Sequence, residues 1–215
     1  ARQQEVYLRH RQGHLVPVRM RVAPLPGNDG GVRGAVEVFA EAKAAGAGGP
    51  VADPQGYLDP DTGLFNREYL EMRLRSRLEE QQRYGWTFGA ILARVDDADT
   101  LRAAHGTEVT DLLIRMTGKT FANALRSFDV VGRWGEAEFL AIVPILRYSD
   151  LYAIGDRIRR LVGLASAAVQ GRVLGVTVSV GAAGADASDS PEDLLDRSRR
   201  WLRASSQAGG NRVSL

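Results

Sequence analysis

Residues 126–139 decide the fold of this chain, and they read Arg-Ser-Phe-Asp-Val-Val-Gly-Arg-Trp-Gly-Glu-Ala-Glu-Phe. Val130 and Val131 lead into Gly132, and a polar tip at 134–138 follows. The apolar run at 139–143 comes next and is closed by Pro144. Two short apolar runs joined through a glycine-bearing link are typical of a β-hairpin. We therefore expect a hairpin here, reached from the end of a helix.

The composition is that of a folded protein, because 44% of the 215 residues are hydrophobic. The 28 basic and 26 acidic residues give a net charge of +2. The arginines are spread along the chain, so a nucleic-acid partner is not indicated. The absence of cysteine excludes disulfides and thiolate metal sites. No apolar run has the length of a membrane span and no signal peptide is visible, so we expect a cytoplasmic protein.

The first part of the chain alternates as strands do. We predict strands near 6–10, 15–22 and 32–39, with a Gly-Asn-Asp-Gly-Gly turn at 27–31. The pattern resembles the last three strands of a PAS sensor domain without its helical half, and an arbitrary β-meander is the alternative. Residues 42–56 are rich in Ala, Gly and Pro, which favours a linker. The predicted organisation is therefore 1–41 PAS-like strands, 42–56 linker and 57–215 a second domain.

The second domain alternates between helical and strand-like segments. Leu70, Leu74 and Leu78 recur at the spacing of one helix face. The following segments predict a strand at 86–95, helices at 99–105 and 108–126, the hairpin, a helix at 149–162, a strand at 173–181 and a last helix from Pro191. This order predicts an α+β fold, an antiparallel sheet with helices on one side.

Two segments carry a resemblance to a known family. Residues 133–139, Arg-Trp-Gly-Glu-Ala-Glu-Phe, resemble the Arg-Tyr-Gly-Gly-Asp-Glu-Phe signature of the GGDEF family, the diguanylate cyclases that join two GTP into cyclic di-GMP. Residues 59–67, Asp-Pro-Asp-Thr-Gly-Leu-Phe-Asn-Arg, resemble the family's Asp-x-Leu-Thr-Gly-Leu-x-Asn-Arg motif, with Asp61 in place of Leu. The resemblance implies the ferredoxin-like fold of polymerase palms over residues 57–215.

The resemblance also implies an active site that has lost its metal. Family members hold Mg²⁺ through carboxylates, and this ion requires oxygen ligands in near-octahedral geometry. The family's Asp at the end of the first strand falls at Arg94, whereas its other ligand is kept as Glu138. Asp96 and Asp97 lie close by, so a two-residue slip would restore a carboxylate.

The family's substrate-binding positions are altered as well. Its glycine pair corresponds to Gly135 and Glu136, and the acidic third position is Ala137. Its guanine-binding Asn and Asp fall at Arg102 and Asp111, and its phosphate-binding Lys and Arg at Ser206 and Gly210. Each lost charge-assisted hydrogen bond costs roughly 1.5–3 kcal/mol. We therefore predict no catalytic residues, no metal site and no cyclase activity.

One constellation of the family is kept. Arg126 and Asp129 match the Arg-x-x-Asp inhibitory site, where cyclic di-GMP binds away from the active site, and Arg157 falls on its third contact. A guanidinium pairs with guanine O6 and N7 or with phosphate, and a carboxylate accepts from the guanine N–H groups. An Arg and an Asp three residues apart are also an ordinary surface pair.

These observations lead to one main hypothesis, a catalytically inactive GGDEF domain that acts as a cyclic di-GMP receptor. It would need no cofactor and would pass the signal to a second copy or a downstream protein. The alternatives are a nucleotide-free dimerisation scaffold and a residual cyclase that uses Asp96 and Glu138.

Overall fold

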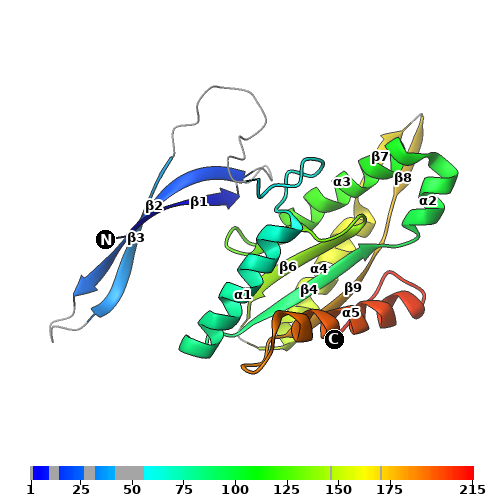
Figure 1. Cartoon of the computed structure of the whole chain (residues 1–215). Helices are drawn as coiled ribbons and strands as arrows, with labels where there is room; N and C mark the ends of the chain where they lie inside the picture. Colours follow the sequence, from blue (N-terminus) through cyan, green and yellow to red (C-terminus); the bar gives the residue numbers. More distant parts are fainter. Residues whose placement is uncertain (1, 10–14, 27–31, 42–55, 146, 170) are drawn as a thin grey trace. The chain divides into compact units, whose positions relative to one another are not determined.

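The computed structural model describes residues 2–9, 15–26, 32–41, 56–145, 147–169 and 171–215, with the part before residue 56 described only through its backbone (Figure 1). The chain divides into two compact units, Ala1–Gln55 and Gly56–Leu215. No helix among the described residues is both long and apolar enough to cross a membrane.

The first unit contains an antiparallel sheet of order β1-β2-β3, formed by β1 (Arg2–Arg9), β2 (Leu15–Pro26) and β3 (Val32–Glu41). The three predicted strands are confirmed, and each is longer than the sequence indicated. The predicted 42–56 linker lies, apart from its last residue, outside the described residues, and the PAS assignment stays a prediction.

The second unit is built on a five-stranded sheet of order β10-β9-β4-β6-β5. The central strand β4 (Phe88–Val95) is antiparallel to β6 (Glu138–Pro144) and to β9 (Val178–Gly184). β5 (Val130–Arg133) and β6 form the expected hairpin. At the other edge the short strand β10 (Val213–Ser214), which the sequence pattern did not predict, pairs in parallel with β9.

Five helices accompany the sheet: α1 (Arg67–Tyr84), α2 (Ala98–His105), α3 (Thr107–Asn123), α4 (Ser149–Leu164) and α5 (Pro191–Gln207). Leu70, Leu74 and Leu78 are buried along one face of α1, as their spacing predicted. Local signals set the helix ends. The Asn66 side chain accepts from Tyr69 N at the start of α1, and a capping box of Ser190 and Asp193 begins α5.

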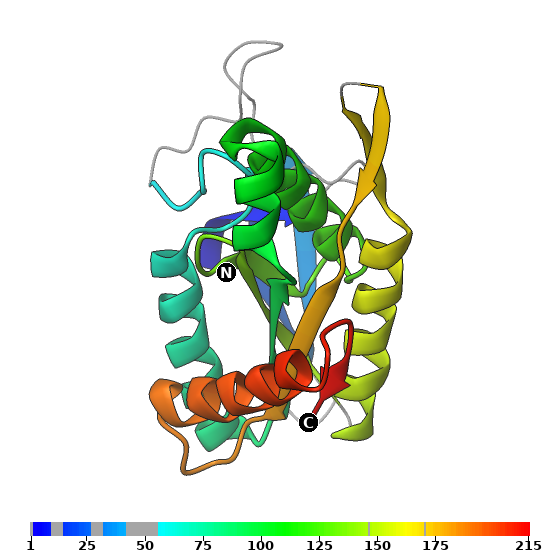
Figure 2. The same ribbon diagram turned by 90° about the vertical axis from the view of Figure 1, so that its right-hand side faces the viewer.

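Helices cover both faces of the sheet, so the expectation of helices on one side is wrong. α1 and α4 lie on opposite sides of it (Figure 2). Along β9, Val178, Val180 and Ala182 belong to the core cluster that contains residues of α3 and α4. A Cβ on Gly181 would lie 2.1 Å from the Leu202 nitrogen in α5, which packs on the other face. The near-continuous apolar run of β4 is the sequence signature of a strand buried on both faces.

The predicted strand at 173–181 is also wrong. β7 (Ser166–Val169) and β8 (Arg172–Gly175) form a separate two-stranded hairpin, and β9 begins only at Val178. Gly171 has a φ of +77°, a conformation that glycine adopts without strain, and it lies where the hairpin turns. The run of valines on both sides of Gly175 concealed this break.

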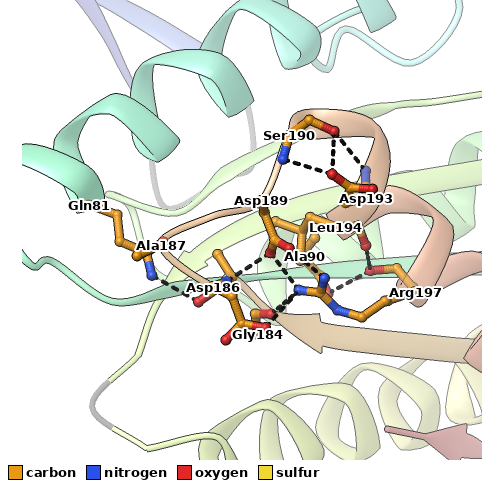
Figure 3. Close-up of polar contacts among 12 residues, drawn as sticks. Gln81, Ala90, Gly184, Asp186, Ala187, Asp189, Ser190, Asp193, Leu194 and Arg197 are labelled. Atoms are coloured by element: carbon orange, nitrogen blue, oxygen red, sulfur yellow. Dashed lines mark hydrogen bonds and ion pairs between the residues drawn. The ribbon is translucent and has the colours of Figure 1, made fainter.

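A polar network fixes the loop before α5 (Figure 3). Arg197 donates from Nη1 and Nη2 to the two carboxylate oxygens of Asp189, at 2.6 and 2.5 Å, and from Nη2 to the Gly184 carbonyl at 2.7 Å. Gln81 of α1 donates to the Ala185 carbonyl at 2.8 Å. The network therefore connects the end of β9 to α1 and α5.

Candidate functional site

The tip of the hairpin is held by one side chain, Arg133 at the end of β5. Its guanidinium donates to the carbonyls of Gly135 and Glu136 within the tip, at 3.2 and 2.9 Å. It also donates to Asp61 at 2.6 Å and to both oxygens of Asp59 at 3.3 Å. Burial by itself would lower the pKa of Arg133, but the bonds and charges of Asp61 and Asp59 raise it above its usual value. The tip is thus tied to the start of the second unit.

The segment before α1 is organised around Asp59. Its carboxylate accepts from the Thr62 backbone nitrogen at 2.9 Å and from the Thr62 hydroxyl at 2.7 Å. Arg133 N donates to the Phe65 carbonyl at 2.8 Å, which attaches this segment to the edge of β5. Residues 59–67 and the hairpin are therefore one structural unit, although they lie far apart in the sequence.

Six of the nine predicted active-site positions meet beside the tip. Arg94, Arg102, Gly135, Glu136, Ala137 and Glu138 line a cavity of about 460 Å³ together with Val95 and residues 97–100 at the start of α2. Asp111, Ser206 and Gly210 are not in its lining.

This cavity, hereafter the tip cavity, contains charges of both signs, because Arg94 and Arg102 line it together with the acidic residues Asp97, Asp99, Glu136 and Glu138. Arg94 stands directly opposite Glu138 in the β4–β6 register, and Arg102 forms an ion pair with Glu136 at 2.5 Å. Among the residues that the structure describes, no three Asp, Glu or His side chains converge as a metal-binding group. Proteins usually hold Mg²⁺ through one or two carboxylates together with substrate phosphates, and the guanidinium of Arg94 opposite Glu138 works against such binding.

Asp96 has another role in this structure. Its carboxylate accepts from the hydroxyls of Thr177 and Ser179, at 2.7 and 2.6 Å, and from Asn211 N at 2.9 Å. It therefore ties the end of β4 to β9 and to the C-terminal segment. Gly210 lies beside it, because a Cβ there would be 3.1 Å from Asp96 Cγ.

The predicted ligand residues Arg126, Asp129 and Arg157 line a second cavity, of about 370 Å³. We call it the turn cavity, and its remaining lining is Pro144, Ile145, Arg147, Asp150, Ala153 and Ile154. Arg126 and Asp129 come from the turn before β5, whereas Arg157 comes from the middle of α4. The structure thus brings the three residues together from two segments.

The local geometry of the first segment is a closed turn. Asp129 accepts from Arg126 N at 2.7 Å through Oδ2, and Asp129 N donates to the Arg126 carbonyl at 3.1 Å. Asp129 is 9% exposed, and the Arg126 and Arg157 side chains are exposed at the rim. Sequence reasoning missed Arg147 and Asp150 in the lining. The signal that could have found them is their own Arg-x-x-Asp spacing.

Comparison with known proteins places this architecture in a family. Residues 56–212 match the family model described as diguanylate cyclase, GGDEF domain. The response regulator PleD of Caulobacter vibrioides is 32% identical over 158 residues, which are 72% of this chain and 35% of PleD. The diguanylate cyclase DgcS of Shewanella oneidensis is 27% identical over 161 residues, 75% of this chain and 53% of DgcS. The chain spans about a third to a half of the length of these relatives.

Solved structures share the fold. The diguanylate cyclase SiaD of Pseudomonas aeruginosa, in complex with its activator SiaC, is 28% identical with a TM-score of 0.71 over 74% of this chain and 61% of SiaD. The GGDEF domain of DgcB from Caulobacter crescentus, in complex with c-di-GMP, is 23% identical with a TM-score of 0.71 over 74% of this chain and 95% of that domain. On the family match over residues 56–212, this chain belongs to the GGDEF family of diguanylate cyclase domains.

Proposed function

We propose that this GGDEF domain makes no cyclic di-GMP and instead binds it in the turn cavity. The observation that carries the proposal is the convergence of Arg126, Asp129 and Arg157 on one cavity of about 370 Å³. We further propose that the domain works in the cytoplasm and passes its ligand state to a second copy or a downstream protein.

The chemistry of the turn cavity suits this ligand. Cyclic di-GMP offers two guanine edges and two phosphate charges. A guanidinium donates two parallel hydrogen bonds to guanine O6 and N7 or to a phosphate, and a carboxylate accepts from the guanine N–H groups. The cavity supplies three arginines and two aspartates, and Ile145, Ala153 and Ile154 add apolar surface on which a base plane can lie. The DgcB domain, which has the same fold, was solved in complex with c-di-GMP, and this supports binding of the dinucleotide by a domain of this fold.

The residues of the tip cavity disfavour catalysis. A guanidinium at Arg94 repels a metal ion, and the Arg102–Glu136 ion pair places charged side chains beside the tip where the family has an Asn and a Gly. Ala137 offers no carboxylate. The Asp96 carboxylate accepts hydrogen bonds from Thr177, Ser179 and Asn211, which supports a structural role for it in place of metal binding.

Calorimetric titration with cyclic di-GMP tests the receptor, with GTP as competitor. We expect binding by the wild type that Arg126→Ala removes and Arg157→Ala weakens, because each lost guanidinium contact costs roughly 1.5–3 kcal/mol, or about ten- to a hundredfold in affinity. The matched control is Arg160→Ala. Arg160 lies on the same helix and pairs with Asp156, outside the turn cavity, and its loss should leave binding unchanged. GTP should not compete.

Two outcomes overturn the proposal. If the wild type gives no heat up to near-millimolar cyclic di-GMP, or Arg126→Ala binds equally well, the nucleotide-free scaffold replaces the receptor. If the protein with GTP and Mg²⁺ or Mn²⁺ shows steady synthesis of cyclic di-GMP that Glu138→Ala abolishes, the domain is a residual cyclase.

A further inference from the structure

The exposed side of α5 carries its charges in two blocks. Asp193, Asp196, Arg200 and Arg203 follow each other at intervals of three, four and three residues, which places them on one helix face. All four residues are exposed, and they line one cavity of about 570 Å³ beside the helix. We call these four residues the charge stripe. Its first half is acidic and its second half is basic.

Contacts within the chain occupy the acidic half of the charge stripe only in part. Asp193 accepts from Ser190 N and Ser190 Oγ in the capping box, at 3.0 and 2.7 Å, and both bonds end on Oδ2 (Figure 3). Asp196 pairs with Arg199 at 2.8 Å, but its side chain is 67% exposed. Both carboxylates therefore keep acceptor capacity that faces solvent.

The helix itself does not account for the basic half of the stripe. Arg200 and Arg203 make no ion pair or hydrogen bond with any residue that the structure describes. The positions three and four residues on either side of Arg203 hold no carboxylate, so its own helix offers it no partner. The helix dipole favours cations only near the C-terminus, and the last turn of α5 contains no basic residue.

The order of the charges fits a second copy of the same helix that runs in the opposite direction. The stripe is symmetric about Ser198, because Asp193 and Arg203 are each five residues from it and Asp196 and Arg200 are each two. Across a two-fold axis, residue i of one copy contacts residue j of the other, and j contacts i. An axis at the level of Ser198 sets each aspartate opposite an arginine. Two copies aligned in the same direction would instead set like charges against each other.

We propose that the charge stripe of α5 is a surface on which a second copy of this chain docks in antiparallel orientation. Asp193 pairs with Arg203 and Asp196 with Arg200 across the axis, and each pair forms twice. The cavity beside the stripe gives room for the long arginine side chains of the second copy. Exposed ion pairs are individually weak and are screened by salt, so the contact is reversible and depends on ionic strength. The stripe shares no residue with the turn cavity, so the proposal does not depend on cyclic di-GMP.

Charge reversal in the full chain tests the contact, with sedimentation equilibrium over a dilution series from near-millimolar to micromolar protein. We expect the wild type to form a dimer whose dissociation constant rises with salt concentration. Asp196→Arg and Arg200→Glu each set like charges opposite one another, so each variant alone should dimerise roughly tenfold or more weakly. An equal mixture of the two variants should recover the affinity of the wild type, because each chain then meets the opposite charge on the other.

The mixture separates docking from folding. A change within one helix, such as the loss of the Asp196–Arg199 pair, stays in its own chain and is not repaired by mixing. Arg160→Glu makes the same charge change on α4, and this control should dimerise as the wild type does. The proposal is overturned if the wild type is monomeric at near-millimolar concentration, if either single reversal leaves the dissociation constant unchanged, or if the mixture dimerises as weakly as the two variants alone.

Discussion

At the scale of single residues, a departure from the family motif can add an interaction instead of removing one. Asp61 replaces the motif's Leu and gives Arg133 a second carboxylate, at 2.6 Å. The two carboxylates differ in burial: the Asp59 side chain is 16% exposed and that of Asp61 is 61% exposed. The more buried Asp59 also orders Thr62, so it contributes more to holding the hairpin tip, and exposed pairs contribute at most about 1 kcal/mol.

Asp189 should make stability depend on pH. Burial would raise the pKa of this carboxyl, but the bonds from Arg197 and from the Asp186 backbone lower it below its ordinary value of 3.8. A lowered carboxyl pKa stabilises the fold above the unfolded value and ceases to do so as pH falls through the folded value. Asp189→Asn should therefore lower the free energy of unfolding by roughly 1.5–3 kcal/mol at neutral pH and flatten its decline below about pH 4.

Urea unfolding between neutral and acid pH measures this effect. Asp196→Asn is the control, because its carboxylate pairs with Arg199 on the exposed surface, 67% and 35% exposed, and should change stability by less than about 1 kcal/mol. If the free energy of unfolding falls equally steeply with decreasing pH below pH 4 in the wild type and in Asp189→Asn, Asp189 is not the source of the pH dependence.

Arg126, Asp129 and Arg157 line one cavity, as their positions relative to the hairpin led us to expect. The hairpin register thus predicted that they lie together, and their role in ligand binding stays a prediction. It could not reveal that Asp96 is bound by Thr177, Ser179 and Asn211, because those contacts join segments with no shared pattern. Arg147 was missed because an Arg-x-x-Asp spacing at the start of a helix does not by itself indicate a ligand site.

At the scale of elements, the close approach of β9 and α5 depends on one glycine. A Cβ at Gly181 would lie 2.1 Å from Leu202 N and 2.3 Å from the Ser198 carbonyl, and both are backbone atoms of a helix. Backbone cannot rotate aside as a flexible side chain can. Gly181→Ala should therefore destabilise the domain by roughly 3 kcal/mol, the upper end of the usual cost of overpacking.

Gly163→Ala in α4 is the matched comparison. Beyond the neighbouring residues and the backbone of the helix itself, no atom of the described residues lies within 4 Å of the added methyl group. Alanine favours a helix over glycine by about 0.5–1 kcal/mol, so this variant should be more stable than the wild type. Thermal unfolding of both variants gives the comparison. If Gly181→Ala has the same melting temperature as the wild type, α5 can move away from β9 with little loss of stability.

Elements were predictable where one periodicity ran long enough. The leucine face of α1 was predicted from its four-residue spacing, and the start of α5 was predicted at Pro191. The two-residue strand β10 carries no pattern, and the apolar run through Gly175 hid two strand boundaries. The apolar run of β4 indicates a strand that is buried on both faces. Its position between β6 and β9 in the sheet, which the run does not give, was needed to see that helices cover both faces.

At the scale of the whole molecule, the two units differ in whether each can be stable as a separate domain. The second unit has a core of its own, because one cluster of buried side chains draws on the sequence from Leu64 to Ala182 and further buried residues lie on the other face of the sheet. The first unit has three strands, and its outer strands β1 and β3 each pair with one other described strand. A sheet of three strands is marginally stable on its own, and open strand edges associate readily.

Deletion of residues 1–55 should therefore lower the oligomeric mass of the protein and leave ligand binding in place. We expect residues 1–40 to pack against another surface, with a second copy of the chain as the partner that an unpaired strand edge favours. Arg126, Asp129 and Arg157 all belong to the second unit, so the affinity for cyclic di-GMP should stay within a few fold. Light scattering after size exclusion, together with thermal unfolding and calorimetry, compares the deletion with the full chain. An unchanged oligomeric mass and melting temperature would contradict the packing of these strands against another surface. A large loss of affinity for cyclic di-GMP would contradict the assignment of the whole ligand site to the second unit.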